Sequence, residues 1–140
     1  MADTIHLELV TPERRVFAED VDEITAQAVL GQFGVLPGHA NLLALLQPGE
    51  LVFIAQGKRR HLAVAGGFAQ VSLDEGIRIL AEAAEFAEEI DVERAKTARE
   101  RAEKRLGEFD PATQADDLGL AEAALHRALV RLQVAEKAQV

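Results

Sequence analysis

The side chains best suited to chemistry in this sequence are arginines in the last third of the chain. Arg94 and Arg101 are seven residues apart, and Arg127 and Arg131 are four apart, so each pair would share one face of a helix. Forked guanidinium groups from two neighbouring helices can converge on phosphate groups. The alternative is a solvated basic face, because runs of charge usually serve solubility. The residues alone leave both interpretations open.

Groups for covalent or metal chemistry are scarce. The chain has no cysteine, and its single serine is Ser72. Its four histidines are dispersed along the chain, with no cluster of ligand residues around them. The phosphate-binding patterns GxxxxGK[ST] and GxGxxG are absent as well. We therefore expect no catalytic residues and no metal site, and a small metal enzyme or hydrolase is disfavoured.

The stretch GQFGVLPGHANLLALLQPGEL, residues 31–51, concentrates four glycines, two prolines and a histidine among apolar residues. Gly31 and Gly34 are placed at a strand end, and the segments LPG and PG predict turns. We predict that ANLLALL forms a short buried turn beneath the sheets. A lone histidine after a turn is more often a hydrogen-bonded structural group than a ligand, which is how we interpret His39.

The elements that must position these groups fall into two halves. Eight of the ten glycines precede residue 80, whereas the second half is rich in Ala, Glu, Arg and Leu. In the first half, Ile5, Leu7 and Leu9 alternate with polar residues, which predicts a half-buried strand. Hairpin signals occur around Gly57 and at LDEG. We predict a β-sandwich or barrel of eight to ten strands over residues 1–86.

Residues 87–140 predict a helical hairpin. Asp91 is a good N-cap, Gly107 is placed to end the first helix, and Asp110-Pro111 is a typical start for a second helix. The seam positions are Ala95, Ala98, Ala102 and Leu106 in the first helix, and Leu118, Ala121, Leu125, Ala128, Leu132 and Ala135 in the second. Alanine seams bury little area, so we expect a hairpin that is marginal alone and docks reversibly.

Composition limits the partners. The chain has 140 residues and a net charge of −9, which disfavours nucleic acid as a ligand. Its 49% hydrophobic and 28% charged residues are ordinary for a globular protein. The first residues lack the pattern of a signal peptide, and no stretch approaches the ~20 apolar residues of a membrane span.

Four blocks in order resemble one family, the epsilon subunits of F-type ATP synthases. They are GQFGVLPGHANLL, LQPGEL, VAGGFAQVS and IDVERA, and the resemblance covers essentially the whole chain. Asn41 stands where many relatives have Pro, and Gln32 where many have Glu.

The resemblance implies a non-catalytic rotor subunit of a proton-translocating enzyme. Its fold would be a ten-stranded β-sandwich followed by an antiparallel two-helix hairpin. The sandwich would bind the gamma subunit and the c-ring, and the hairpin would either fold onto the sandwich or extend into the head formed by the alpha and beta subunits and inhibit ATP hydrolysis. The implied location is the cytoplasmic face of a bacterial plasma membrane, peripheral and reached only through the complex.

The resemblance also implies site residues. Those of the loop that would contact neighbouring subunits are Gly31, Gly34, Leu36, Pro37, Gly38 and His39. In some bacterial relatives the folded hairpin binds ATP as a regulatory ligand, with no cofactor required. The residues that match that ATP site are Glu85, Ile90, Asp91, Arg94, Ala95, Arg101, Arg127 and Arg131. A free-standing nucleotide sensor is the competing hypothesis, and it would purify alone instead of with its neighbours.

Overall fold

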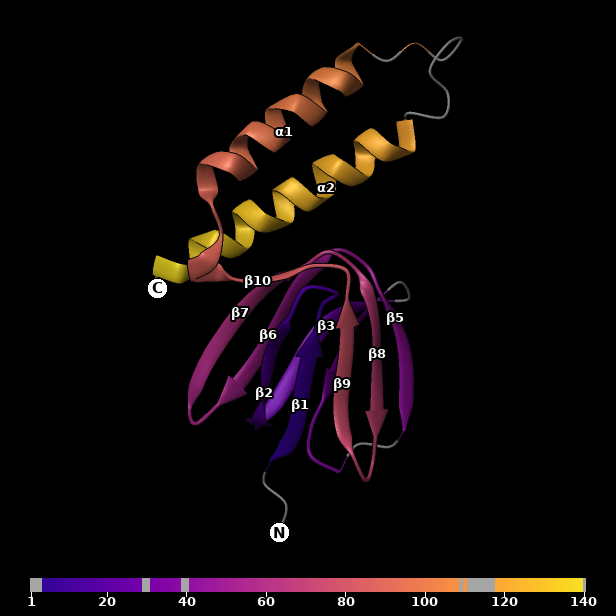
Figure 1. Ribbon diagram of the computed structural model, residues 1–140, viewed down its shortest axis with the longest axis vertical. Helices are drawn as coiled ribbons and strands as arrows, with labels where there is room; N and C mark the ends of the chain where they lie inside the picture. Colours follow the sequence, from indigo (N-terminus) through magenta and orange to yellow (C-terminus); the bar gives the residue numbers. More distant parts are fainter. Residues whose placement is uncertain (1–3, 29–30, 39–40, 109, 111–117, 140) are drawn as a thin grey trace.

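The chain folds into a β-sandwich with a two-helix hairpin across one of its ends (Figure 1). The computed structural model describes residues 4–28, 31–38, 41–108, 110 and 118–139. The strands are β1 (Ile5–Val10), β2 (Arg15–Val21), β3 (Glu23–Ala28), β4 (Gly31–Val35), β5 (Leu42–Leu46), β6 (Gly49–Ala55), β7 (Lys58–Val64), β8 (Gly67–Ser72), β9 (Gly76–Ala81) and β10 (Ala84–Phe86). The helices are α1 (Val92–Gly107) and α2 (Leu118–Ala135), with short 3₁₀ turns η1 (Ala87–Glu89) and η3 (Glu136–Gln139).

The strands form one continuous sheet that folds over on itself. Their order is β10-β7-β6-β3-β5-β8-β9-β1-β2, with β4 paired to the side of β3. Among the described residues, one ladder pair, Ala28 with Leu46, joins the β3 side to the β5 side, and the sheet separates there into two layers. Strands β1 and β9 run parallel, and the other pairings of the described strands are antiparallel. The ten-stranded sandwich implied by the resemblance is confirmed.

The core lies between the two layers and follows the period-two pattern of the strands. Leu7 and Leu9 are fully buried, which confirms the alternation predicted for β1. Phe53 of β6 lies at the centre, with its ring centroid 4.4 Å from that of Phe17 on β2. This core cluster contains no hairpin residue, so the sandwich has an apolar core of its own.

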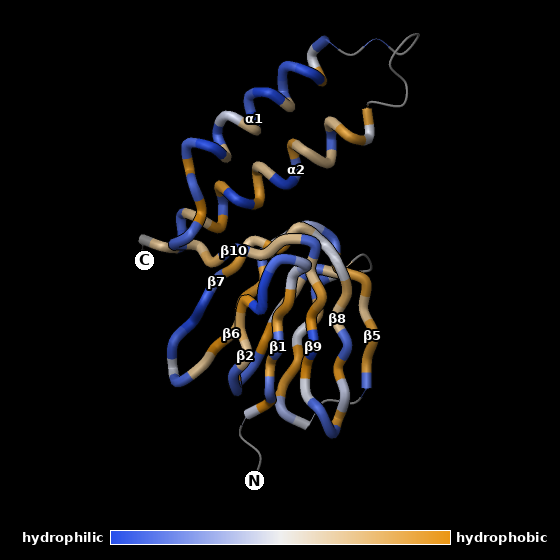
Figure 2. Tube along the Cα trace, viewed as in Figure 1, coloured by the Kyte–Doolittle hydropathy of each residue, from blue (hydrophilic) through white to orange (hydrophobic). Residues whose placement is uncertain are grey.

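The prediction of a buried turn at ANLLALL is wrong. Leu42–Leu46 is strand β5, paired along its whole length with β8. Leu46 is buried on the inner face, whereas Leu43 and Leu45 are 71% and 63% exposed on the outer face. A short apolar run cannot be assigned to helix or strand by periodicity, and here both faces of a strand carry leucine. Figure 2 shows this strand as largely apolar. The turn predicted at LPG is present at Pro37–Gly38.

The first helix of the hairpin begins where its cap predicts. The side chain of Asp91 accepts a hydrogen bond from the backbone N–H of Arg94 at 3.1 Å, and α1 runs to Gly107. The second described helix begins at Leu118, and the start predicted at Pro111 falls outside the described residues. No described helix combines the length and apolar character that crossing a membrane would need.

The hairpin rests on the sandwich through α2, which lies between α1 and the sheets (Figure 1). Its seam with α1 is built from small residues, since Ala95, Ala102, Ala121 and Ala128 are all buried. A second, separate apolar cluster attaches α2 to the sandwich. We call it the docking cluster, and it contains Ala63, Ala87, Ile90, Val130, Val134 and Ala135.

Candidate functional site

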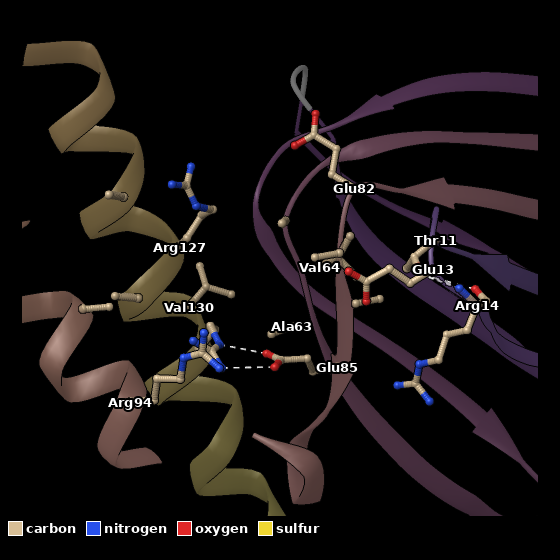
Figure 3. Close-up of a pocket in the computed structure, with 17 residues that line it drawn as sticks. Thr11, Glu13, Arg14, Ala63, Val64, Glu82, Glu85, Arg94, Arg127 and Val130 are labelled. Carbon is tan, nitrogen blue, oxygen red and sulfur yellow. Dashed lines mark hydrogen bonds and ion pairs between the residues drawn. The ribbon is translucent and has the colours of Figure 1, made fainter. Parts of the chain in front are cut away.

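A cleft lined by charged side chains lies between the hairpin and the sandwich (Figure 3). Its volume is about 620 Å³, which lies within the usual range for sites that hold small molecules. Both helices contribute to one wall, and β7, β10 and the turn between β1 and β2 contribute to the other.

The hairpin wall is basic. It carries Arg94 from α1 and Arg127 and Arg131 from α2. Neither Arg94 nor Arg127 forms an ion pair within the part of the chain that the structure describes. Figure 3 shows the side chains of both on the hairpin side of the cleft. Two guanidinium groups are therefore available to an anion.

The third arginine is already paired. Arg131 donates from Nε to Oε2 of Glu85 at 2.8 Å, and from Nη2 to Oε1 at 3.1 Å. The side chains of Arg131 and Glu85 are 24% and 35% exposed, so solvent screens this bidentate pair only in part.

The sandwich wall is mostly acidic. Glu13, Glu82 and Glu85 line it, together with Arg14 (Figure 3). Arg14 is engaged by Glu89 of η1 at 3.3 Å. The cleft therefore sets a basic wall on the hairpin against an acidic wall on the sandwich, and the Glu85–Arg131 pair bridges the two.

The structure brings together four of the eight residues that the resemblance assigned to ATP. Glu85, Arg94, Arg127 and Arg131 all line the cleft. Arg101 is exposed and does not line it, because seven residues of helix place it about 10 Å along α1 from Arg94.

The remaining three assigned residues, Ile90, Asp91 and Ala95, have structural roles outside the cleft. Asp91 caps α1 through its carboxylate. Ile90 is 7% exposed and belongs to the docking cluster, and Ala95 is fully buried. None of the three lines the cleft, so any part they take in binding requires a ligand that reaches beyond it.

Of the charged residues that the sandwich contributes, the sequence analysis included Glu85 but missed three others. Glu13, Arg14 and Glu82 are separated from the arginines of α2 by dozens of residues. No local spacing signals their approach, which results from the docking of α2.

A second surface feature is an apolar row on the outer face of the sheet. Leu45 pairs with Phe68, and Phe68 pairs with Leu80, so the three side chains follow one another across β5, β8 and β9. They are 63%, 41% and 38% exposed, and Leu43 beside them is 71% exposed. A shallow groove of about 790 Å³ runs along this row as far as Arg127.

The loop residues predicted to contact other subunits are only partly described. Gly31 and Gly34 lie in β4, and Leu36, Pro37 and Gly38 follow it, with Leu36 58% exposed. His39 lies outside the described residues.

Fold and site together define a class. The described residues include no group of three or more His, Cys, Asp or Glu side chains arranged to hold a metal ion. What they do present is a sandwich with an exposed apolar face, a helical hairpin and a charged cleft, which are typical of a chain that works through binding.

Comparisons with known proteins give the family. Residues 4–87 match the family model for the β-sandwich domain of the ATP synthase delta/epsilon chain, and residues 88–136 match the model for its long α-helix domain. The ATP synthase epsilon chain of Geotalea uraniireducens is 49% identical over 138 residues, covering 99% of this chain and 98% of that one. The epsilon chain of Geobacter sulfurreducens is 48% identical with the same coverage.

A solved structure agrees. A chain of the Euglena gracilis mitochondrial ATP synthase, from a structure of its OSCP, F1 and c-ring, superposes with a TM-score of 0.78 at 29% identity, covering 100% of this chain and 84% of that one. The chain therefore belongs to the ATP synthase delta/epsilon chain family, as an epsilon chain and a non-catalytic subunit of that enzyme. The resemblance drawn from the four sequence blocks is confirmed.

Proposed function

We propose that this chain works in the central stalk of the ATP synthase, where its sandwich attaches to the gamma subunit and the c-ring and helps to couple proton flow to ATP synthesis. The complex would hold it at the cytoplasmic face of the bacterial plasma membrane. The similarity to a chain from an F1 and c-ring assembly supports this role.

The apolar row supplies a surface for attachment. Contiguous exposed apolar side chains usually mark interaction sites. Leu45, Phe68 and Leu80 form such a strip on a rigid sheet, and the exposed Leu36 and Leu43 add to the apolar surface. A strip on paired strands keeps its shape under load, which suits a contact that transmits torque.

The hairpin is the regulatory part of this proposal. Apart from the docking cluster, three polar contacts between described residues hold α2 and η3 on the sandwich: the Glu85–Arg131 pair, His126 Nε2 with the carbonyl of Pro48 at 3.1 Å, and Lys137 with Glu50 at 3.5 Å. The docking cluster contains three alanines and only three larger side chains. An interface this small can open, and the released hairpin would extend toward the alpha and beta subunits and inhibit ATP hydrolysis.

Basic residues on α1 would make the inhibitory contact. Lys104 and Arg105 are exposed near the end of that helix, and Arg99 is held only by Glu103 among the described residues, with 3.6 Å between the charged groups. In the extended state these side chains would meet acidic loops of the beta subunit.

The ligand that we assign to the cleft is ATP, which would bind the docked state of the hairpin and stabilise it. The cavity volume, the unpaired guanidinium groups of Arg94 and Arg127 within the described part of the chain, and the position of the cleft between the two bodies support this assignment. A ligand bound only to the docked state stabilises it by RT ln(1 + [L]/Kd). High ATP would then keep the hairpin docked, and low ATP would let it rise.

A titration of ATP into the isolated chain, followed by calorimetry, tests the nucleotide site. We expect saturable binding at or below millimolar ATP. Arg127→Ala should weaken it roughly 10- to 100-fold, because a charged hydrogen-bond donor to phosphate is lost. Arg59→Ala is the control, since Arg59 is exposed on β7 and does not line the cleft. No saturation with millimolar ATP, or equal effects of the two substitutions, would contradict the site.

A further inference from the structure

We propose that Glu85 is an internal competitor for the anionic ligand of the cleft, with its carboxylate occupying the place on Arg131 that a phosphate oxygen would take. This inference rests on the proposed nucleotide site, and it concerns how that site is kept closed. It gives Glu85 a role opposite to that of a ligand-binding residue.

The geometry of the pair carries the inference. Both oxygens of Glu85 are engaged by the Nε and Nη2 groups of Arg131, at 2.8 and 3.1 Å. This parallel arrangement is the one in which arginine also binds two oxygens of a phosphate. A phosphate that uses the same edge of Arg131 must displace the carboxylate.

The carboxylate of Glu85 competes with the ligand for Arg131 alone, and not for the two neighbouring arginines. Arg94 and Arg127 line the same cleft without an ion pair among the described residues. A polyanion can therefore meet these two groups first and would displace Glu85 only to gain the third. The displaced carboxylate would stay on the acidic wall, beside Glu82 and Glu13, and would repel the bound ligand.

The same pair also fastens the hairpin. Glu85 belongs to β10 and Arg131 to α2, so the bond joins the sandwich to the hairpin. Replacing the carboxylate by an amide therefore has two opposing effects on ligand binding. It removes the competitor, which tightens binding, and it loosens docking, which lowers the fraction of chains able to bind.

A matched control separates these effects. Glu50 contacts Lys137 of η3 at 3.5 Å, so it too joins the sandwich to the hairpin, but it does not line the cleft. Glu50→Gln removes a docking contact without removing a competitor, and it should leave binding equal or weaker.

The experiment is a calorimetric titration of the full chain and both variants with ATP and with inorganic triphosphate, which isolates the phosphate contribution. We expect Glu85→Gln to bind both probes roughly three- to tenfold more tightly than the unchanged chain. In the unchanged chain, the ligand must break the partly screened Glu85–Arg131 ion pair to reach Arg131, and in the variant that ion pair is gone. A fold check by circular dichroism accompanies each variant, and the partial exposure of Glu85 favours folding of the amide variant.

The outcomes are distinct. If the unchanged chain binds and Glu85→Gln binds no more tightly than Glu50→Gln, which loses a docking contact alone, the competitor is refuted while the nucleotide site stands. If only Glu85→Gln binds, the carboxylate closes the site, as we infer. If neither binds either probe, the nucleotide site fails and the competitor fails with it.

Discussion

Gly67 is a residue that the sandwich needs to be glycine. It opens β8 at a φ of +131°, a conformation that L side chains rarely adopt. It also faces Ala81 across the β8–β9 pairing. A Cβ at this position would overlap the carbonyl oxygen of Leu80 and would lie 2.8 Å from the Cα of Ala81. Two backbones meet here at a distance that only glycine permits.

We expect Gly67→Ala to destabilise the sandwich by more than about 3 kcal/mol, from backbone strain plus the clash with β9. Gly31→Ala is the matched control, because Gly31 has a φ of +129° but open space where a methyl group would lie. It should lose only about 1–2 kcal/mol from strain. Denaturant unfolding gives both values, and equal losses would mean that close approach is not what requires glycine at residue 67.

The sequence predicted which site residues lie together only where they are close in the chain. The four-residue interval between Arg127 and Arg131 placed both on one face of a helix, and both line the cleft. The same reasoning grouped Arg101 with Arg94, but the cleft ends before the next turns of α1. The bond between Arg131 and Glu85 joins residues 46 apart, and no local pattern encodes such a pairing.

At the scale of elements, the strands and the first helix were readable because each has a local cause. Alternation marked β1, and a capping carboxylate marked the start of α1. Strand β5 was not readable, because leucines lie on both its inner and its outer face and hide the alternation. The docking face of α2 was missed for a different reason. Val130 and Val134 lie beside the alanine seam, and only the sandwich gives them a partner.

The segment η1 belongs with the sandwich. Arg60 of β7 pairs with Glu88 at 2.7 Å and lies 4.2 Å from the ring centre of Phe86, and Arg14 pairs with Glu89. A truncation that respects these contacts removes residues 91–140 and keeps η1.

We expect this truncated chain to assemble with the enzyme, because the core of the sandwich contains no hairpin residue. ATP hydrolysis by the assembled enzyme should rise severalfold, because the inhibitory element is gone. Co-purification and an ATPase assay measure the two effects. Failure to assemble would contradict the division of labour between sandwich and hairpin.

At the scale of the whole molecule, a stable sandwich and a weakly attached hairpin share one small interface. The sandwich is held by a continuous ladder of paired strands and a large apolar core. The hairpin is held by an alanine seam, the six residues of the docking cluster and a few polar contacts. At ~0.8 kcal/mol for each buried CH₂ group, the alanines add little. We therefore expect undocking to need much less free energy than unfolding of the sandwich, which is what the proposed control by a ligand in the cleft requires.

Hydrogen exchange of the full chain, read by mass spectrometry with and without saturating ATP, tests this account most directly. Amides of α1 and α2 should exchange much faster than those of β1 and β9 without nucleotide, and ATP should slow the helices while leaving the strands unchanged. Helices as protected as the strands, and indifferent to ATP, would contradict the account.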